Sequence, residues 1–150
     1  MTHRMVLMKF SHIGVAVANL DHAIAAYQKI FGYVLCSGPF LDPVQKVSVC
    51  FLSRAGDADV SIELVAPEGD ESPVNSILMK GISAYHLCYE VADINEALTH
   101  VRSHGCLVLG EPVQAVAFQG RRIAWFYTPT RQLTELVERS SAPQPAPSPR

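Results

Sequence analysis

An internal repeat constrains the fold of this 150-residue chain more than any other feature. The segment HIGVAVANLDHAIAAY begins at His12, and HLCYEVADINEALTHV begins 74 positions later, at His86. Each copy opens on a histidine at the head of an apolar run. The tripeptide Glu-Leu-Val also recurs, beginning at Glu63 and at Glu135. The chain is therefore predicted to contain two tandem modules of similar length.

Each module has the pattern of a strand, a helix and three further strands. FSHIGVAVA is short and β-branched, which is typical of a strand, and Asn19 or Asp21 can cap the helix that follows. In the second copy, Asp93 and Glu96 form a capping-box pattern, and Gly105 can end the helix in a left-handed conformation. The later strands are expected at 33–41, 46–53 and 59–66, and at 106–114, 115–127 and 132–138.

These elements predict an α+β protein in which two tandem βαβββ modules form one cupped mixed sheet. We expect a single domain over residues 1–139. Its parts are module one at about 9–67, a linker with a short helix at about 68–83, and module two at about 84–139. Residues 140–150 are rich in Pro, Ala and Ser and lack large apolar side chains, so this tail is expected to be disordered.

Composition excludes several classes of protein. A net charge of −2 argues against a nucleic-acid partner, which would need a basic surface. The apolar runs are too short to span a bilayer, and the N-terminus does not have the pattern of a signal peptide. The four cysteines show no CxxC spacing, so we expect buried, reduced thiols in a cytoplasmic protein.

Alternation along the strands separates two faces. In HIGVAV, the face of Ile13 and Val15 is bulky and apolar and should pack on a helix. The other face carries His12, Gly14 and Ala16, a polar group beside unusually small residues. This pattern indicates a concave sheet face with room for a ligand.

The two glutamates lie between apolar neighbours, where burial is costly unless the carboxylate is paired or binds a cation. A lone histidine at a strand start is more often structural, and a lone strand glutamate is more often solvent-facing. Packing, however, gives no reason to repeat both polar types at matched places in two copies. The pattern therefore favours a divalent-metal site formed by His12, Glu63, His86 and Glu135, which suits Co, Ni, Zn or Mn. The other histidines, His3, His22, His100 and His104, are expected to be solvated.

The repeat and its polar positions resemble the vicinal oxygen chelate superfamily, which includes glyoxalases, bleomycin-resistance proteins and extradiol dioxygenases. The resemblance covers residues 10 to 138. It implies paired βαβββ modules around one divalent metal ion, with His12, Glu63, His86 and Glu135 as the ligands. SIELVAPEGDESPVNSILMKGISAYHLCYEVADINEAL is most similar to the methylmalonyl-CoA epimerases of this superfamily, whereas YTPT at 127–130 departs from the HPK that they commonly have.

The resemblance implies an isomerase that removes a proton next to a carbonyl group through a metal-stabilised enediolate. Glu135 is the first choice for the proton-transfer group and Glu63 is the second. The resemblance implies a small-molecule substrate, with an acyl-CoA thioester as the candidate, and a homodimer, since family members often pair. The alternatives are a lactoylglutathione lyase, a biosynthetic relative acting on another α-acidic carbonyl compound, and a metal-free binding protein that confers drug resistance.

Two further expectations concern polar residues outside the four ligands. Epimerisation needs a second acid/base, and Glu90 lies on the same face as His86, although a plain surface role is an equal alternative. Arg121 and Arg122 can contact an anionic part of the substrate, but a solvated pair at a hairpin tip is favoured.

Overall fold

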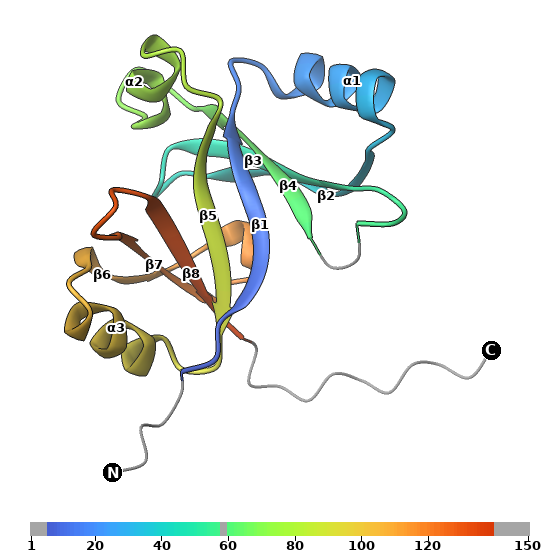
Figure 1. Ribbon diagram of the computed structural model, residues 1–150. Helices are drawn as coiled ribbons and strands as arrows, with labels where there is room; N and C mark the ends of the chain where they lie inside the picture. Colours follow the sequence, from blue (N-terminus) through green and yellow to red (C-terminus); the bar gives the residue numbers. More distant parts are fainter. Residues whose placement is uncertain (1–5, 58–59, 140–150) are drawn as a thin grey trace.

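The structure is a computed structural model in which residues 6–57 and 60–139 are described, so the expected disordered tail lies outside the described residues. The architecture is α+β, with eight strands in one curled sheet (Figure 1). The elements, in chain order, are β1 (Lys9–Ala16), α1 (Leu20–Phe31), β2 (Val34–Asp42), β3 (Val47–Ser53), β4 (Ser61–Pro67), α2 (Val74–Met79), β5 (Ala84–Val91), α3 (Ile94–Ser103), β6 (Leu107–Gln114), the 3-10 helix η1 (Val116–Phe118), β7 (Arg122–Tyr127) and β8 (Leu133–Glu138).

The order of the strands reflects the internal repeat. The sheet runs β2-β3-β4-β1-β5-β8-β7-β6, so that each module supplies four adjacent strands. Within the modules, β1 is parallel to β4 and β5 is parallel to β8. The modules join where β1 and β5 run antiparallel at the centre of the sheet (Figure 1). The expected mixed sheet of two βαβββ modules is therefore confirmed.

Side-chain caps begin both long helices. The side chain of Asn19, rather than Asp21, accepts a hydrogen bond from the backbone N–H of His22 at 2.9 Å. The Asp93 side chain accepts one from the backbone N–H of Glu96 at 3.0 Å. These bonds satisfy backbone donors that the first turn of a helix leaves unpaired. Within the described ranges, none of the helices has both the length and the apolar character needed to cross a membrane.

The helices cover one face of the sheet and leave the other face to the interior of the cup. Val15, Leu52 and Leu64 pack against Ala23 of α1 in one apolar cluster. A second cluster joins the apolar side of α3 to β7 and β8, including the fully buried Leu136. The bulky face predicted for β1 therefore does pack on a helix. Because this face is covered, the histidines of β1 and β5 point to the opposite side.

The segment expected as a strand at 115–127 differs from the structure. Residues Val116–Phe118 form η1, and β7 begins only at Arg122. Gln119 and Gly120 both have positive φ, and the Gly120 N–H donates to the Ala115 carbonyl at 3.0 Å. This turn folds the Phe118 ring inward, where it is buried.

The cysteines also depart in part from expectation. Cys50 and Cys88 are buried free thiols, whereas Cys36 is exposed and Cys106 is half-buried. Cys36 lies on β2 at the edge of the sheet, and its thiol is 2.6 Å from the Ser53 hydroxyl. An outer strand has no neighbour on one side, so an apolar pattern there does not guarantee burial.

Candidate metal centre

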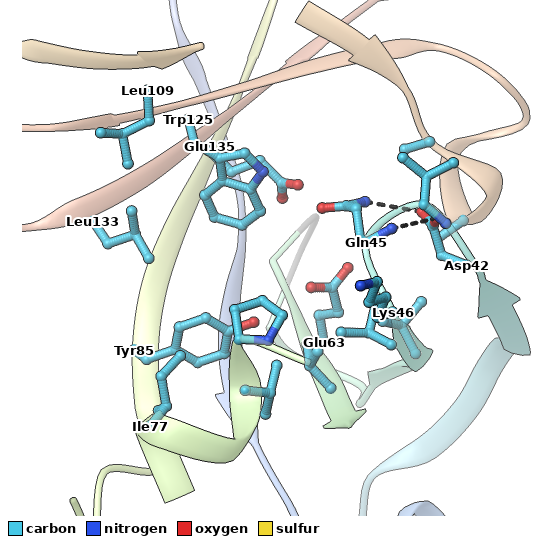
Figure 2. A pocket seen from close by; sticks show the side chains of 18 of the residues that line it. Asp42, Gln45, Lys46, Glu63, Ile77, Tyr85, Leu109, Trp125, Leu133 and Glu135 are labelled. Atoms are coloured by element: carbon cyan, nitrogen blue, oxygen red, sulfur yellow. Dashed lines mark hydrogen bonds between the residues drawn. The ribbon is translucent and has the colours of Figure 1, made fainter. Parts of the chain in front are cut away.

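The concave side of the sheet holds a cavity of about 610 Å³ between the two modules. Its lining includes the carboxylates of Glu63 and Glu135 together with the aromatic rings of Tyr85 and Trp125 (Figure 2). A volume of this size suits a small-molecule ligand. Further lining comes from the β2–β3 turn, α2, β6 and η1.

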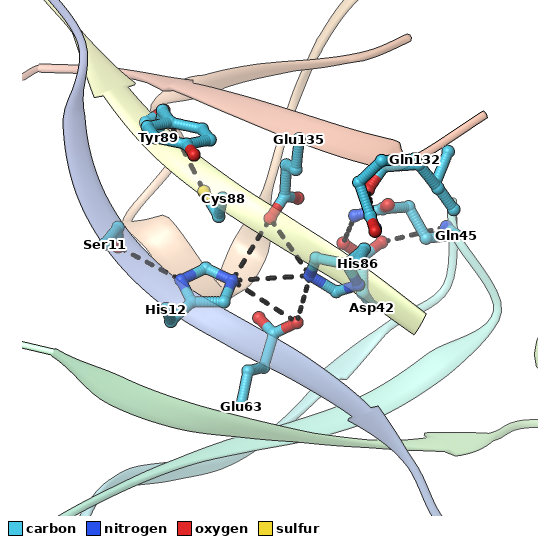
Figure 3. A network of polar contacts seen from close by, with 11 residues as sticks. Ser11, His12, Asp42, Gln45, Glu63, His86, Cys88, Tyr89, Gln132 and Glu135 are labelled. Atoms are coloured by element: carbon cyan, nitrogen blue, oxygen red, sulfur yellow. Dashed lines mark hydrogen bonds and ion pairs between the residues drawn. The ribbon is translucent and has the colours of Figure 1, made fainter. Parts of the chain in front are cut away.

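Four polar side chains converge at the base of this cavity. Their ligand atoms, one each from His12, Glu63, His86 and Glu135, all lie within 4.8 Å of one another (Figure 3). All four residues are buried, and both imidazoles are almost completely inaccessible. The structure therefore brings together every residue that the sequence singled out as a metal ligand.

The repeat explains this convergence. His12 and His86 lie on the two central strands, β1 and β5, and the carboxylates lie on the parallel neighbours β4 and β8. In register, Glu63 lies beside Gly14, two residues along β1 from His12, and therefore on the same face. The same pairing of strands occurs in both modules, so each module brings one histidine and one glutamate to the same face of the sheet.

The closest contacts cross between the modules. Glu135 Oε1 is 3.3 Å from His12 Nε2, whereas it is 3.6 Å from His86 Nε2 in its own module. Glu63 Oε1 is 3.4 Å from His86 Nε2 and 3.8 Å from His12 Nε2. The two Nε2 atoms are 3.4 Å apart. Neither module alone holds the complete set.

Gly14 makes room for one of the imidazoles. It pairs with His86 across the β1–β5 junction. A Cβ atom built at Gly14 would lie 1.9 Å from Cε1 of the His86 ring, far inside van der Waals contact. Packing thus explains the small residue near His12, because the His86 ring occupies the space that a side chain at Gly14 would need.

Aromatic rings enclose the histidines. The His12 ring lies 5.4 Å from Phe51 edge-on and 5.8 Å from Phe118 in a stacked arrangement. The His86 ring lies 4.8 Å from Trp125, measured between centroids. Because these rings exclude water, charges in the centre interact more strongly than they would on the surface.

The electrostatics of the centre favour positive charge. Burial by itself lowers the pKa of His12, but a hydrogen bond to Glu135 and the negative charges of Glu63 and Glu135 outweigh it and raise the pKa above its ordinary value. Burial, followed by the charge of Glu135, raises the pKa of the nearby Cys88 thiol well above its usual range. Cys88 therefore stays a neutral thiol and is a poor ligand for a metal ion.

The donor set fits a divalent cation. Bonds of about 2.0–2.2 Å to nitrogen and oxygen put the ligands of one cation roughly 3 to 4.4 Å apart, which is the range of the contacts above. Apart from its contacts with the two imidazoles, Glu135 Oε1 is buried without a hydrogen-bond partner among the described residues, and His86 Nδ1 is also buried without one. His12 Nδ1 shares a 3.0 Å hydrogen bond with the Ser11 hydroxyl, which orients the ring with Nε2 toward the centre. The geometry thus suits two imidazole and two carboxylate ligands.

Tyr85 is a cavity residue that the sequence pattern missed. Strict alternation along β5 places it opposite to His86, yet both side chains reach the cavity side. The pairing of β1 with β5 shifts register between Gly14 and Val15, and this irregularity turns the start of β5. Trp125, the only tryptophan of the chain, was also missed, because its segment was not resolved into η1 and β7.

Asp42 is a further buried carboxylate in the cavity lining, and its contacts indicate a structural role. It accepts hydrogen bonds from the backbone N–H groups of Val44 and Gln45, both at 3.1 Å, and from the Gln45 side chain at 2.9 Å (Figure 2). These bonds hold the turn between β2 and β3 and occupy both carboxylate oxygens.

Glu90 lies outside this centre, and its contacts fit a surface role, the alternative to a second acid/base. Its carboxylate lies 3.1 Å from Arg139 and 3.6 Å from Arg121. Glu90 is four residues beyond His86 on β5, toward the end of the strand, and it is absent from the cavity lining. Although Glu90 shares a face of the strand with His86, its carboxylate does not reach the four converging side chains.

The arginine pair is engaged elsewhere as well. Arg122 makes two hydrogen bonds to the Glu138 carboxylate, at 3.1 and 2.8 Å. Arg121 donates to the Phe118 carbonyl at 3.2 Å and lies over the ring of that residue. Neither arginine lines the main cavity, so neither the expected substrate contact nor a simple solvated pair describes them. The lysines of the cavity lining are Lys46 and Lys80.

The fold and the centre agree with the comparison to known families. Residues 11–125 match the Glyoxalase/Bleomycin resistance protein/Dioxygenase superfamily. The chain belongs to this superfamily. The resemblance noted from the sequence is therefore confirmed at the level of the family.

Individual relatives are more specific. An ethylmalonyl-CoA/methylmalonyl-CoA epimerase of Cereibacter sphaeroides is 29% identical over 121 residues, which are 79% of this chain and 87% of the relative. The crystal structure of the methylmalonyl-CoA epimerase of Mycobacterium tuberculosis has a TM-score of 0.79 and 27% identity and covers 93% of both chains. A lactoylglutathione lyase of Arabidopsis thaliana is 27% identical over 144 residues, 91% of this chain and 46% of the lyase.

Proposed function

We propose that this protein is a divalent-metal-dependent epimerase that exchanges the proton next to the carbonyl of an acyl-CoA thioester, with methylmalonyl-CoA as the best substrate candidate. The observation that carries the proposal is the convergence of two imidazoles and two carboxylates at the base of a cavity. Similarity to epimerases named for methylmalonyl-CoA supports the choice of substrate.

The proposed ligands are His12, Glu63, His86 and Glu135. A bound Co, Ni, Zn or Mn ion would polarise the carbonyl oxygen of the substrate and stabilise negative charge on it. The aromatic walls exclude water from the reacting atoms, which strengthens that effect. Lys80 adds positive charge to the cavity lining, which suits an anionic substrate, whereas Lys46 is paired with Glu71 at 2.7 Å.

Epimerisation requires proton transfer on two faces of a planar carbanion. Glu135 and Glu63 come from opposite modules, and both line the cavity. We assign removal of the α-proton to Glu135 and delivery of a proton to the other face to Glu63, with the roles exchanged in the reverse direction. The other carboxylates of the lining are engaged in a turn or in an exposed ion pair, and Glu90 is paired with Arg139. Glu63 and Glu135 are therefore the two carboxylates available for proton transfer.

The test follows the α-hydrogen of methylmalonyl-CoA in deuterated water. Purified protein is expected to contain close to one divalent ion per chain by elemental analysis and to incorporate deuterium at the α-carbon. A chelator should abolish incorporation, and added Co²⁺ or Zn²⁺ should restore it, because carbanion formation needs the cation. An absence of exchange in the metal-loaded protein would rule out the epimerase proposal.

Glutamine variants separate the two proposed roles of the carboxylates. Glu63→Gln and Glu135→Gln each keep an oxygen donor but lose the proton acceptor. Conversion between the two enantiomers should fall by about 10²- to 10⁴-fold in each variant. Each variant should still exchange the proton of one enantiomer, a different one in each case. Glu111→Gln, on an exposed part of β6, is the matched control and should behave as wild type.

A lactoylglutathione lyase activity is the second candidate, favoured by the similarity to the plant lyase. It would use the same four residues on the hemithioacetal of methylglyoxal and glutathione. Formation of a thioester product, followed by its ultraviolet absorbance, distinguishes the two activities. Turnover of the hemithioacetal together with no deuterium exchange in methylmalonyl-CoA would assign the lyase instead.

A further inference from the structure

Tyr85 is a cavity residue with a polar group that so far has no assigned role. Figure 2 shows its hydroxyl turned toward the space between the carboxylates of Glu63 and Glu135. Its ring lies edge-on against the His86 ring, with 4.5 Å between the centroids. The phenol is therefore adjacent to the proposed metal centre without being one of the four converging ligands.

The ring of Tyr85 is held by packing. It lies against a buried apolar cluster that includes Val47, Val65 and Val74, so strands of the first module and helix α2 fix its position. The register shift at the β1–β5 junction directs the side chain to this side of the sheet. A phenol held in this way needs little ordering when a ligand binds, which favours a specific contact.

The hydroxyl of Tyr85 makes no hydrogen bond to any of the residues that the structure describes. A phenol is a hydrogen-bond donor at neutral pH, and this half-buried side chain lines the cavity, where its hydroxyl can meet a bound ligand. The carboxylates of Glu63 and Glu135 already have the cation and the α-proton as their proposed partners, and a bound ligand brings further oxygen acceptors into the same cavity. An oxygen that gains negative charge during the reaction is the acceptor to which such a donor binds most strongly.

We propose that the Tyr85 hydroxyl donates a hydrogen bond to an oxygen of the substrate and stabilises the negative charge that develops on it when the α-proton leaves. The proposal rests on the proposed function, since it assigns a contact in the same cavity. No bond to Tyr85 forms or breaks: the proton moves from the α-carbon to a carboxylate, and the phenol keeps its own proton.

Tyr85→Phe tests this role because it removes only the hydroxyl and keeps the packed ring. We expect kcat for deuterium exchange to fall about 100-fold, while KM changes by less than about threefold, because the negative charge on the oxygen is absent from the bound substrate and develops only as the α-proton leaves. Metal content should stay at the wild-type level. Tyr89→Phe is the matched control, since Tyr89 lies on the same strand but packs with Phe10 and the α3 cluster.

A binding measurement gives a second result that does not depend on turnover. Oxalate, a planar dianion that resembles an enediolate, is titrated calorimetrically into the zinc-loaded proteins. Tyr85→Phe should weaken oxalate binding by about tenfold or more, as expected for a hydrogen bond to a charged group, and Tyr89→Phe should leave it unchanged.

The possible failures are distinguishable. If wild type exchanges deuterium and Tyr85→Phe matches it in both kcat and oxalate affinity, the role of Tyr85 is wrong and the proposed function stands. If Tyr85→Phe loses its metal ion, the hydroxyl acts on the cation rather than on the substrate, which also overturns the proposal. If wild type shows no exchange, the epimerase proposal fails, and the oxalate titration still decides whether Tyr85 binds an anionic oxygen.

Discussion

The histidine–glycine contact shows how single positions define the centre. His86 can occupy its place only because position 14 carries no Cβ atom. The three atoms nearest to a Cβ at Gly14 all belong to the His86 ring, so the closest conflict created by a larger residue is with this ring. This contact couples a backbone position of one module to a proposed metal-ligand position of the other.

Gly14→Ala should therefore destabilise the protein by about 1 to 3 kcal/mol, the usual range for overpacking a filled interior. In a His86→Ala background the same change should cost less than about 0.5 kcal/mol, because the ring is gone. Urea denaturation of the four proteins of this cycle, all measured with chelator present, gives the coupling energy.

Cobalt binding reports the effect of the same change on the centre. Trp125 lies beside His86, and it is the only tryptophan, so its fluorescence should be quenched when Co²⁺ binds. Gly14→Ala should weaken Co²⁺ affinity by tenfold or more. Equal costs of Gly14→Ala in both backgrounds would show that the steric account is mistaken.

The sequence predicted the site residues where a pattern was repeated. It failed to predict them where the backbone departs from regular strand pairing. The four converging residues stood out because two polar types recurred at matched strand positions. Tyr85 was missed because one irregularity in strand pairing moved it to the cavity side. The alternation left two roles open for Glu90, because a shared face says nothing about distance along a strand, and four residues separate it from His86.

Between secondary structure elements, Glu138 joins three parts of the second module. Its carboxylate at the end of β8 accepts a hydrogen bond from the backbone N–H of Ile94, the first residue of α3, at 2.9 Å. The same carboxylate binds Arg122 at the start of β7. A negative charge at the N-terminus of a helix is stabilising, so this residue assists the capping by Asp93.

Glu138 gives a prediction about acid stability. The hydrogen bond from Arg122, with that from Ile94, lowers the pKa of Glu138 below its ordinary value of 4.5 despite partial burial. Because the unfolded chain then binds this proton more readily than the folded chain, the contribution is complete above about pH 4.5 and is lost as the pH falls through the lower folded-state pKa.

Glu138→Gln should therefore cost about 1 to 2 kcal/mol at pH 7 and progressively less below pH 4.5, as measured by urea denaturation across pH. Glu111→Gln is the control, because position 111 is exposed on β6. A cost for Glu138→Gln that stays constant down to pH 3 would contradict this account.

The elements themselves were predicted well wherever local signals were strong. Capping residues and glycines marked both long helices, and apolar alternation marked the strands. The exception was 115–127, where an apolar sequence hides a 3-10 turn. That turn forms because the Phe118 ring fills a space beside His12 and Phe51, which is a tertiary contact that no local pattern reveals.

Across the whole molecule, a bound cation would connect the two modules. The closest imidazole–carboxylate contacts are Glu135 with His12 and Glu63 with His86, each pair drawn from both halves of the chain. Without the cation, two buried carboxylates face each other at this junction. The stability of the whole fold should therefore depend on metal binding.

Zinc at about 100 times its dissociation constant should stabilise the folded protein by about 2.7 kcal/mol. For a chain of this size, that corresponds to an increase in Tm of roughly 5 to 10 °C over the chelator-treated protein, measured by circular dichroism. The double variant His12→Ala/His86→Ala should show no increase. A comparable shift in the double variant would mean that zinc binds elsewhere.

The crosswise pairing has a consequence for how such a protein can originate and be divided. Each half of the sequence encodes one imidazole and one carboxylate that lean toward the opposite half. A gene for a single half would specify an incomplete site, which two copies could complete by associating side by side. Fusing those copies into one chain frees each half to diverge, and cutting the chain between α2 and β5 should yield fragments that regain a cation site only on reassociation.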